Sequence, residues 1–201
     1  MVLKSICESP GYLTMFKALL AKIGQKLSDA GLPYMIIGGQ AILLYGSPRL
    51  TKDIDITLGV NIDGLESTLK TVKDMGLEII PDDPESFVKK TFVLPTKDRT
   101  TGIRVDLIFS FSPYEQQAIA RAKPVFFNDT AVMFALLEDV IIHKIFAGRP
   151  RDIEDVVTVM LKNPDFDREY IELWLKEFDL AMETNEFITR FAELCREADK
   201  V

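Results

Sequence analysis

The sequence is poor in the residues that build disulfide frameworks and structural zinc sites. Its 201 residues include two cysteines and one histidine. The cysteines, Cys7 and Cys195, stand near opposite ends of the chain, and neither belongs to a CxxC pair or a Cys/His cluster. Such closely spaced ligands are the usual mark of a zinc site, and several paired cysteines mark a disulfide scaffold. The sequence supports neither.

Long apolar runs are also missing. The longest candidate, Ala131–Ala147, is interrupted by charged residues such as Glu138 and Lys144, whereas a membrane-spanning helix needs about 18–20 apolar residues. The N-terminal stretch has no continuous apolar segment before Glu8, so no secretory signal is visible. We therefore expect a protein without a membrane span, located in the cytoplasm.

Positive charge is in deficit. There are 24 Lys and Arg against 31 Asp and Glu, which gives a net charge of −7. An acidic chain disfavours a surface that wraps broadly on phosphate backbones, although a local basic groove stays open. An anionic ligand would need a metal ion to offset the negative charge of the protein. The chain is otherwise 47% hydrophobic and 27% charged, which is typical of a globular protein able to bury its own core.

Hydrophobic periodicity predicts a mixed fold that becomes helical toward its C-terminus. The predicted strands are 34–37, 53–58, 77–80, 90–95, 103–109 and 124–127. The predicted helices are 12–30, 41–45, 64–75 with Asp63 as its cap, 113–121, 130–147, 150–162, 167–180 and 185–199. We therefore expect an α/β fold, α+β in detail. A small mixed sheet with flanking helices would occupy residues 1–128, and a helical bundle at 129–201 would pack against it.

Three aspartates stand out on the predicted strands. Asp53 and Asp55 alternate with Ile54 and Ile56, so both carboxylates leave one strand face, about 7 Å apart at the Cα atoms. Asp106 faces outward from the strand at 103–109 in the same way. Carboxylates on one face repel each other unless a cation offsets them, and hard oxygen ligands suit Mg²⁺.

The alternative interpretation is that Asp53, Asp55 and Asp106 are ordinary solvent-facing residues. Arg49, Lys52 or Arg104 would then neutralise them.

The surroundings of Asp53 and Asp55 favour the metal site. Gly38-Gly39 closes a predicted strand and opens a short helix, an arrangement whose free backbone N–H groups can hold a phosphate. Arg49 precedes the carboxylates, where it would either stabilise phosphate charge or form a salt bridge that restrains their strand. Thr51 is also near and reads best as a turn or strand-start residue.

These residues carry a family resemblance. Ile37-Gly38-Gly39, thirteen further residues and then Asp53-Ile54-Asp55-Ile56 resemble the signature of the nucleotidyltransferase (polymerase-beta-like) superfamily. The longer string from Gly38 to Ile56 is similar in particular to the AbiEii-type toxins and related minimal nucleotidyltransferases. Asp106, within Arg-Val-Asp-Leu-Ile, matches the third carboxylate of that family.

The resemblance implies an enzyme that moves a nucleoside monophosphate from an NTP to an acceptor hydroxyl and releases pyrophosphate. It places Gly38 and Gly39 near the triphosphate and assigns Mg²⁺ to Asp53 and Asp55. Asp106 would bind metal and help to activate the acceptor hydroxyl. Two Mg²⁺ ions are expected, with Mn²⁺ as a substitute.

A looser similarity over Leu137–Asp155 implies that Lys144 contacts phosphate, as Gly38, Gly39, Arg49 and Thr51 would. A solvated helix lysine is the alternative. Gln40 departs from the family, which often carries a small hydroxyl residue there. The lone His143 is expected to be a packed or surface residue rather than a catalyst.

The resemblance leaves the acceptor open among RNA, a protein and a small molecule, and it implies an antitoxin-like partner. The alternative function is a catalytically silent nucleotide- or metal-binding module with a regulatory or toxin–antitoxin role.

Overall fold

The computed structural model of the chain describes residues 10–46, 53–110 and 112–198. Arg49, Thr51, Lys52 and Cys7 lie outside the described residues. The chain divides into two compact units, residues 1–37 with 50–134 and residues 38–49 with 135–201. The predicted boundary at residue 128 stays a prediction.

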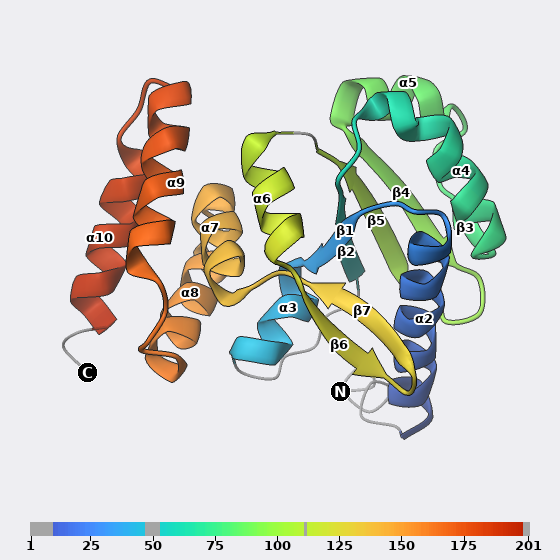
Figure 1. Cartoon of the computed structure of the whole chain (residues 1–201), viewed down its shortest axis with the longest axis horizontal. Helices are drawn as coiled ribbons and strands as arrows, with labels where there is room; N and C mark the ends of the chain where they lie inside the picture. The colour runs from blue at the N-terminus through green and yellow to red at the C-terminus, as the bar shows by residue number, and fades with distance from the viewer. Residues whose placement is uncertain (1–9, 47–52, 111, 199–201) are drawn as a thin grey trace. The chain divides into compact units, whose positions relative to one another are not determined.

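The first unit is built on a mixed sheet, seven-stranded in the described part, with the order β3-β4-β5-β2-β1-β7-β6 (Figure 1). The strands are β1 (Tyr34–Ile37), β2 (Asp53–Leu58), β3 (Leu77–Ile79), β4 (Val93–Asp98), β5 (Arg104–Phe109), β6 (Lys123–Phe127) and β7 (Thr130–Phe134). Its helices are α2 (Pro10–Asp29), α4 (Leu65–Asp74), α5 (Pro84–Thr91) and α6 (Pro113–Arg121), with a short 3₁₀ turn, η1, at Ile62–Gly64. The predicted α/β class is confirmed.

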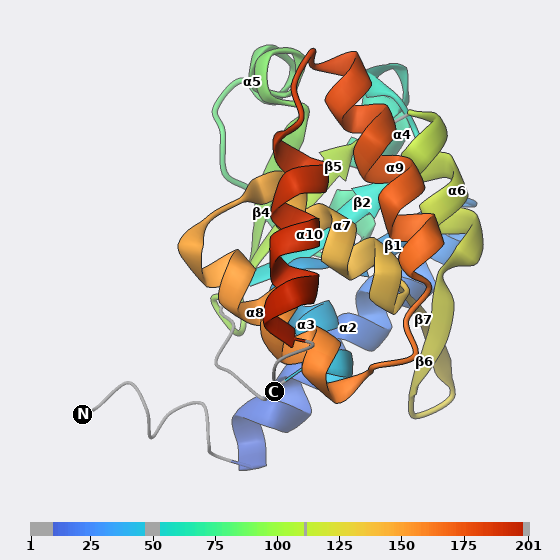
Figure 2. The same ribbon diagram turned by 90° about the vertical axis from the view of Figure 1, so that its left-hand side faces the viewer.

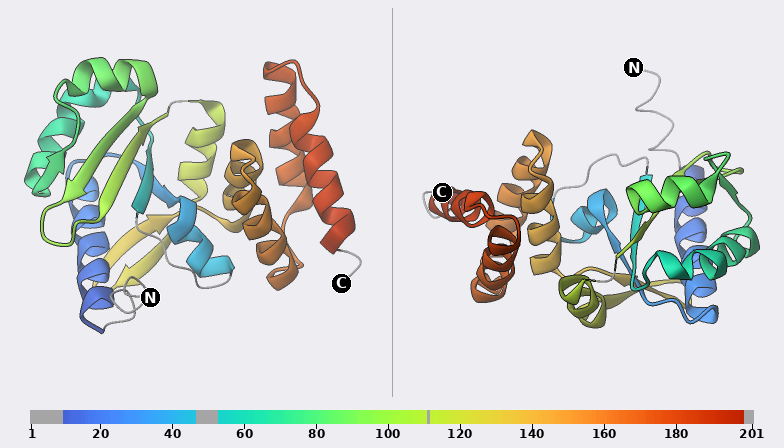
Figure 3. Two further views of the ribbon diagram at one scale, coloured as in Figure 1. Left: turned by 180° about the vertical axis from the view of Figure 1, so that it is seen from behind. Right: turned by 90° about the horizontal axis from the view of Figure 1, so that it is seen from above.

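One face of this sheet is apolar and lies under α2. Tyr34 and Ile36 of β1 stand opposite Leu58 and Ile56 of β2, and all four side chains are buried. A Cβ on Gly24 of α2 would come within 2.9 Å of both Tyr34 Oη and Val132 Cγ2. The helix therefore approaches β1 and β7 closely at this glycine, and α4 lies beside α2 (Figure 3).

The segment between β3 and β4 contains a helix that the sequence analysis missed. Asp83 accepts a hydrogen bond from the Ser86 backbone N–H at 3.0 Å, and Pro84 occupies the first turn, which together form a strong helix start. α5 therefore runs to Thr91. The strand predicted at 90–95 is displaced accordingly and begins at Val93.

Two further predictions in this unit are wrong in detail. Asn61, not Asp63, caps the turn before α4, since its side chain accepts from the Ile62 backbone N–H. The helix predicted at 130–147 is a strand over its first five residues, because β7 pairs with β6 in an antiparallel hairpin. Asn128 adopts the left-handed conformation at its turn, with φ of 53°, which suits a tight hairpin loop.

The described part of the second unit is helical (Figure 2). It comprises α3 (Gly38–Tyr45), α7 (Leu137–Ala147), α8 (Pro150–Lys162), α9 (Arg168–Ala181) and α10 (Glu186–Ala198). Tyr45 Oη donates to the Ala135 carbonyl at 3.0 Å, and Asn163 Nδ2 donates to the Tyr45 carbonyl at 2.8 Å. Asp179 caps α10 by accepting from backbone N–H groups. The predicted C-terminal helices are confirmed from residue 137 onward.

Across the described residues, no helix combines the length and apolar character needed to cross a membrane.

The close approach at Gly24 predicts that Gly24→Ala destabilises the protein by about 1–3 kcal/mol through overpacking, despite the higher helix propensity of alanine. Urea unfolding would measure the change. The double variant Gly24→Ala/Tyr34→Phe should lose less stability than the two single variants together, because removal of Tyr34 Oη makes room for the methyl group. Strict additivity would contradict the proposed contact.

Candidate active site

The second face of the sheet in the first unit carries the aspartates. β2 and β5 are parallel neighbours, with Asp53 in register with Arg104 and Asp55 in register with Asp106. Because side chains alternate along a strand, these four residues leave the sheet on one face, opposite Ile54 and Ile56. Strand register thus places the three aspartates predicted from the sequence on one face of the sheet.

Arg104 supplies a positive charge on this carboxylate face. Its Nε donates to Asp106 Oδ1 at 2.7 Å. The hydrogen bond to Asp106 raises the pKa of the guanidinium; burial opposes this shift, and the negative charges of Asp106, Asp53 and Asp55 add to it. All three carboxylates therefore act electrostatically on one arginine.

The donor set fits a hard divalent cation in its chemistry, since carboxylate oxygens are the ligands that Mg²⁺ prefers. Within the part of the chain that the structure describes, however, no three His, Cys, Asp or Glu side chains gather closely enough to hold a metal ion. Asp106 is instead held by the guanidinium of Arg104, whose positive charge takes the place of a metal ion. The residue types and their register are suitable for binding a divalent metal ion. The side chains, however, are arranged with Asp106 bound to Arg104.

Gly38 and Gly39 follow directly on β1, whose last residue, Ile37, stands opposite Asp55. Gly38 adopts φ of +65°, a conformation that L side chains rarely adopt. It begins α3, which has no acidic residue in its first turn. Gly38 and Gly39 therefore have the local geometry of a phosphate-binding helix start, and their contact with nucleotide stays a prediction.

Lys144 of α7 lies in a buried ion cluster of the second unit. Its Nζ lies 2.5 Å from Asp152 Oδ1 and 2.9 Å from Asp155 Oδ2, and the three side chains are 9%, 11% and 11% exposed. Asp152 and Asp155 sit three residues apart on α8, so both face the same lysine. The interpretation of Lys144 as a solvated helix lysine is therefore wrong, and its predicted phosphate contact remains untested.

Sequence reasoning missed that Asp152 and Asp155 enclose Lys144. The sequence did contain a signal, because two aspartates at helical spacing follow Lys144 on the next predicted helix, 150–162.

His143 precedes this lysine on α7, with its Nε2 shielded from solvent. Burial lowers the pKa of the imidazole to about 4. It is therefore neutral at pH 7.

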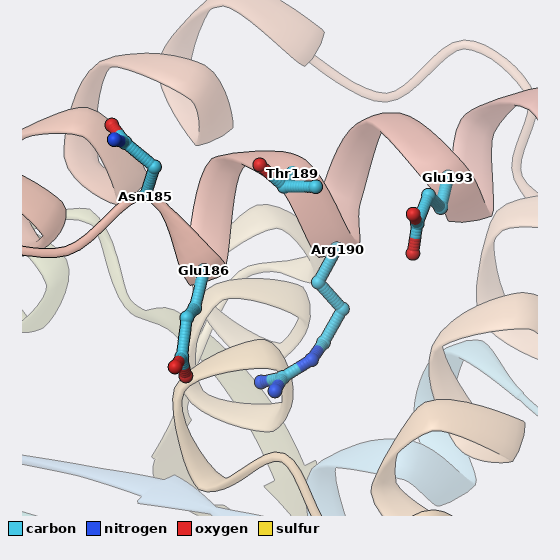
Figure 4. Close-up of a pocket in the computed structure, with 5 residues that line it drawn as sticks. All are labelled: Asn185, Glu186, Thr189, Arg190 and Glu193. Atoms are coloured by element: carbon cyan, nitrogen blue, oxygen red, sulfur yellow. The ribbon is translucent and has the colours of Figure 1, made fainter.

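An open pocket of about 430 Å³ lies along α10, lined by Asn185, Glu186, Thr189, Arg190 and Glu193 (Figure 4). Arg190 Nη1 donates to the Ile145 carbonyl of α7 at 2.8 Å. The guanidinium thus joins α10 to the end of α7, and the pocket contains none of the predicted site residues.

The buried ion cluster predicts a large cost for Lys144→Met. Removal of the cation leaves two buried carboxylates without their counter-charge, which should cost about 3–5 kcal/mol in the free energy of unfolding. Lys176→Met is the matched control, because Lys176 forms an exposed pair with Glu172 at 3.0 Å and should cost less than about 0.5 kcal/mol. Equal losses in urea unfolding would contradict the buried role of Lys144.

His143 predicts a pH dependence of stability. The unfolded chain takes up a proton near pH 6.5, whereas folded His143 does so only near pH 4. Stability therefore falls as the pH drops from 6.5 toward 4, by up to about 1.4 kcal/mol per pH unit from this group. The stability difference between wild type and His143→Gln should shrink over that range in unfolding titrations. Parallel pH profiles would show that His143 does not titrate this way.

Comparison with solved structures identifies the fold. The solution structure of the antibiotic-resistance factor ANT(2'')-Ia matches with a TM-score of 0.57 and 16% identity, covering 94% of this chain and 99% of that one. The crystal structure of ANT(2'')-Ia in complex with adenylyl-2''-tobramycin matches with a TM-score of 0.55 and 18% identity, covering 79% of this chain and 94% of that one. An antigenic nucleotidyltransferase-like protein from Paracoccidioides brasiliensis matches with a TM-score of 0.52 and 20% identity, covering 72% of this chain and 74% of that one. These likenesses show a nucleotidyltransferase-like fold.

Among curated proteins, no sequence matches significantly. At the family level, residues 26–198 match the family described as "Nucleotidyl transferase AbiEii toxin, Type IV TA system". The match covers most of the chain, which therefore belongs to the AbiEii nucleotidyltransferase toxin family.

Proposed function

We propose that this protein transfers a nucleoside monophosphate from an NTP to an acceptor hydroxyl, with release of pyrophosphate, in a reaction that needs a divalent cation. Membership of the family supports the reaction class. The observation that carries the finer proposal is the register of β2 with β5, which sets Asp55 beside Asp106 and keeps Asp53 on the same face.

Asp53 and Asp55 would bind the cation through carboxylate oxygens, and Asp106 would share it. When bound, Mg²⁺ neutralises triphosphate charge and acidifies an acceptor hydroxyl. Asp106, on the neighbouring strand, would accept the proton of that hydroxyl. The backbone N–H groups at Gly38 and Gly39 would hold phosphate oxygens.

The class of acceptor molecule is also part of this proposal. ANT(2'')-Ia was solved with adenylyl-2''-tobramycin, which is an adenylylated small molecule, whereas the family description names a toxin of a type IV toxin–antitoxin system. The net charge of −7 favours a cationic small molecule or a protein over a polyanion. RNA, a protein and a small molecule all remain acceptors for the assay to distinguish.

Asp53→Asn and Asp55→Asn should each abolish nucleotide binding that depends on Mg²⁺ while leaving the fold intact, because asparagine keeps the shape and removes the charge. Melting with ATP, GTP, CTP or UTP in Mg²⁺ measures this. A nucleotide at about 100 times its Kd stabilises by about 2.7 kcal/mol, or roughly 5–10 °C. Asp74→Asn, an exposed change at the end of α4, is the matched control and should keep the shift.

A full shift in either active-site variant would place the nucleotide site elsewhere. If wild type binds an NTP but transfers no label from it to RNA, protein or small-molecule acceptors, the catalytically silent module becomes the better assignment.

A further inference from the structure

We propose that Arg104 is an internal counter-cation of the carboxylate face, which holds Asp106 while no metal is bound and releases it when a divalent cation binds. The inference rests on the proposed function, because it assigns the cation to Asp53, Asp55 and Asp106. It adds a residue that sets how tightly the protein binds metal.

The Arg104 guanidinium lies on the carboxylate face itself. Arg104 and Asp106 are two residues apart on β5 and share a face, and Arg104 also stands in register with Asp53. Its Nε lies 2.7 Å from Asp106 Oδ1, the length of a strong charge-assisted hydrogen bond. Arg104 therefore neutralises charge at the place where the metal is expected.

Arg104 and a metal ion would bind the same carboxylate group of Asp106. A carboxylate oxygen binds Mg²⁺ at about 2.0–2.1 Å, which brings the divalent ion close to a guanidinium held on the same carboxylate group, and the two positive charges repel each other. Metal binding and the ion pair therefore compete for Asp106.

Arg104 and Asp106 differ in their exposure to solvent. The Arg104 side chain is 55% exposed and that of Asp106 only 17%, so the arginine can turn into solvent while the aspartate keeps its place on the strand. The Lys144 cluster differs, because cation and anions there are all nearly buried. Of these two ion-pair systems, the one on the carboxylate face is built to open.

The test compares wild type with Arg104→Gln and Arg104→Lys, using Mn²⁺ binding followed by electron paramagnetic resonance and melting with and without Mn²⁺. Arg104→Gln should bind Mn²⁺ about three- to tenfold more tightly, because the competing charge is gone. Arg104→Lys keeps the charge and should lie between the two. Without metal, Arg104→Gln should melt below wild type, and the difference should vanish at saturating Mn²⁺.

Arg99→Gln is the matched control. Arg99 forms an exposed pair with Glu78, 3.5 Å long, in the same unit. A structural surface pair of this kind should shift the melting temperature equally at every Mn²⁺ concentration and leave the Mn²⁺ Kd unchanged. Linkage adds a quantitative check, since the ratio of Kd values must equal the factor by which Arg104→Gln changes the metal-free unfolding constant.

Two results would overturn the inference. Weaker Mn²⁺ binding in Arg104→Gln would mean that the arginine prepares Asp106 for metal, and an unchanged Kd would mean that no competition exists. The variant Asp53→Asn distinguishes these two results, which concern Arg104 alone, from failure of the proposed function. If wild type binds no Mn²⁺, or if Asp53→Asn binds it equally, the carboxylate site itself is refuted.

Discussion

The parallel pairing of β2 with β5 is the constraint on which the carboxylate face depends. Each strand alone presents one or two acidic side chains to solvent, which is unremarkable in a protein of net charge −7. Pairing in register sets Asp55 beside Asp106 and Asp53 beside Arg104, at the spacing of about 4.8 Å between strands. The repulsion that follows requires a cation on this face, and Arg104 provides one.

The two units meet the same electrostatic need in different ways. In the first, the cation is a half-exposed arginine that shares its strand with the carboxylate. In the second, Lys144 reaches from α7 to two aspartates of α8 and is enclosed with them. Removing charged groups from water is costly, so an enclosed pair persists only when its partners remain together. An exposed pair is worth little and exchanges partners readily.

Local patterns in the sequence predicted the elements whose cause is local. The alternation at Asp53–Leu58 and Arg104–Phe109 marks strands because each has one apolar face. β7 was predicted as helix because its apolar residues continue into α7 without a strong break, and its strand state comes from pairing with β6. The parallel partner of β2 and the hydrogen bond between Arg104 and Asp106 depend on packing and rotamers, which no local pattern specifies. The roles of Asp53, Asp55 and Asp106 in catalysis stay predictions.

The sheet order has a consequence for how the protein acquires its carboxylate face during folding. Asp55 and Asp106 are neighbours in space but 51 positions apart in the chain (106 − 55), and the antiparallel pair β3–β4 and three helical segments lie between them. Contacts at such separation form late, because the entropy of closing a long loop must be met first. Arg104 and Asp106, by contrast, are neighbours from the moment β5 extends. A partly folded chain therefore has its third carboxylate next to an arginine before Asp53 and Asp55 lie beside it, so the complete carboxylate face exists only once the sheet has formed.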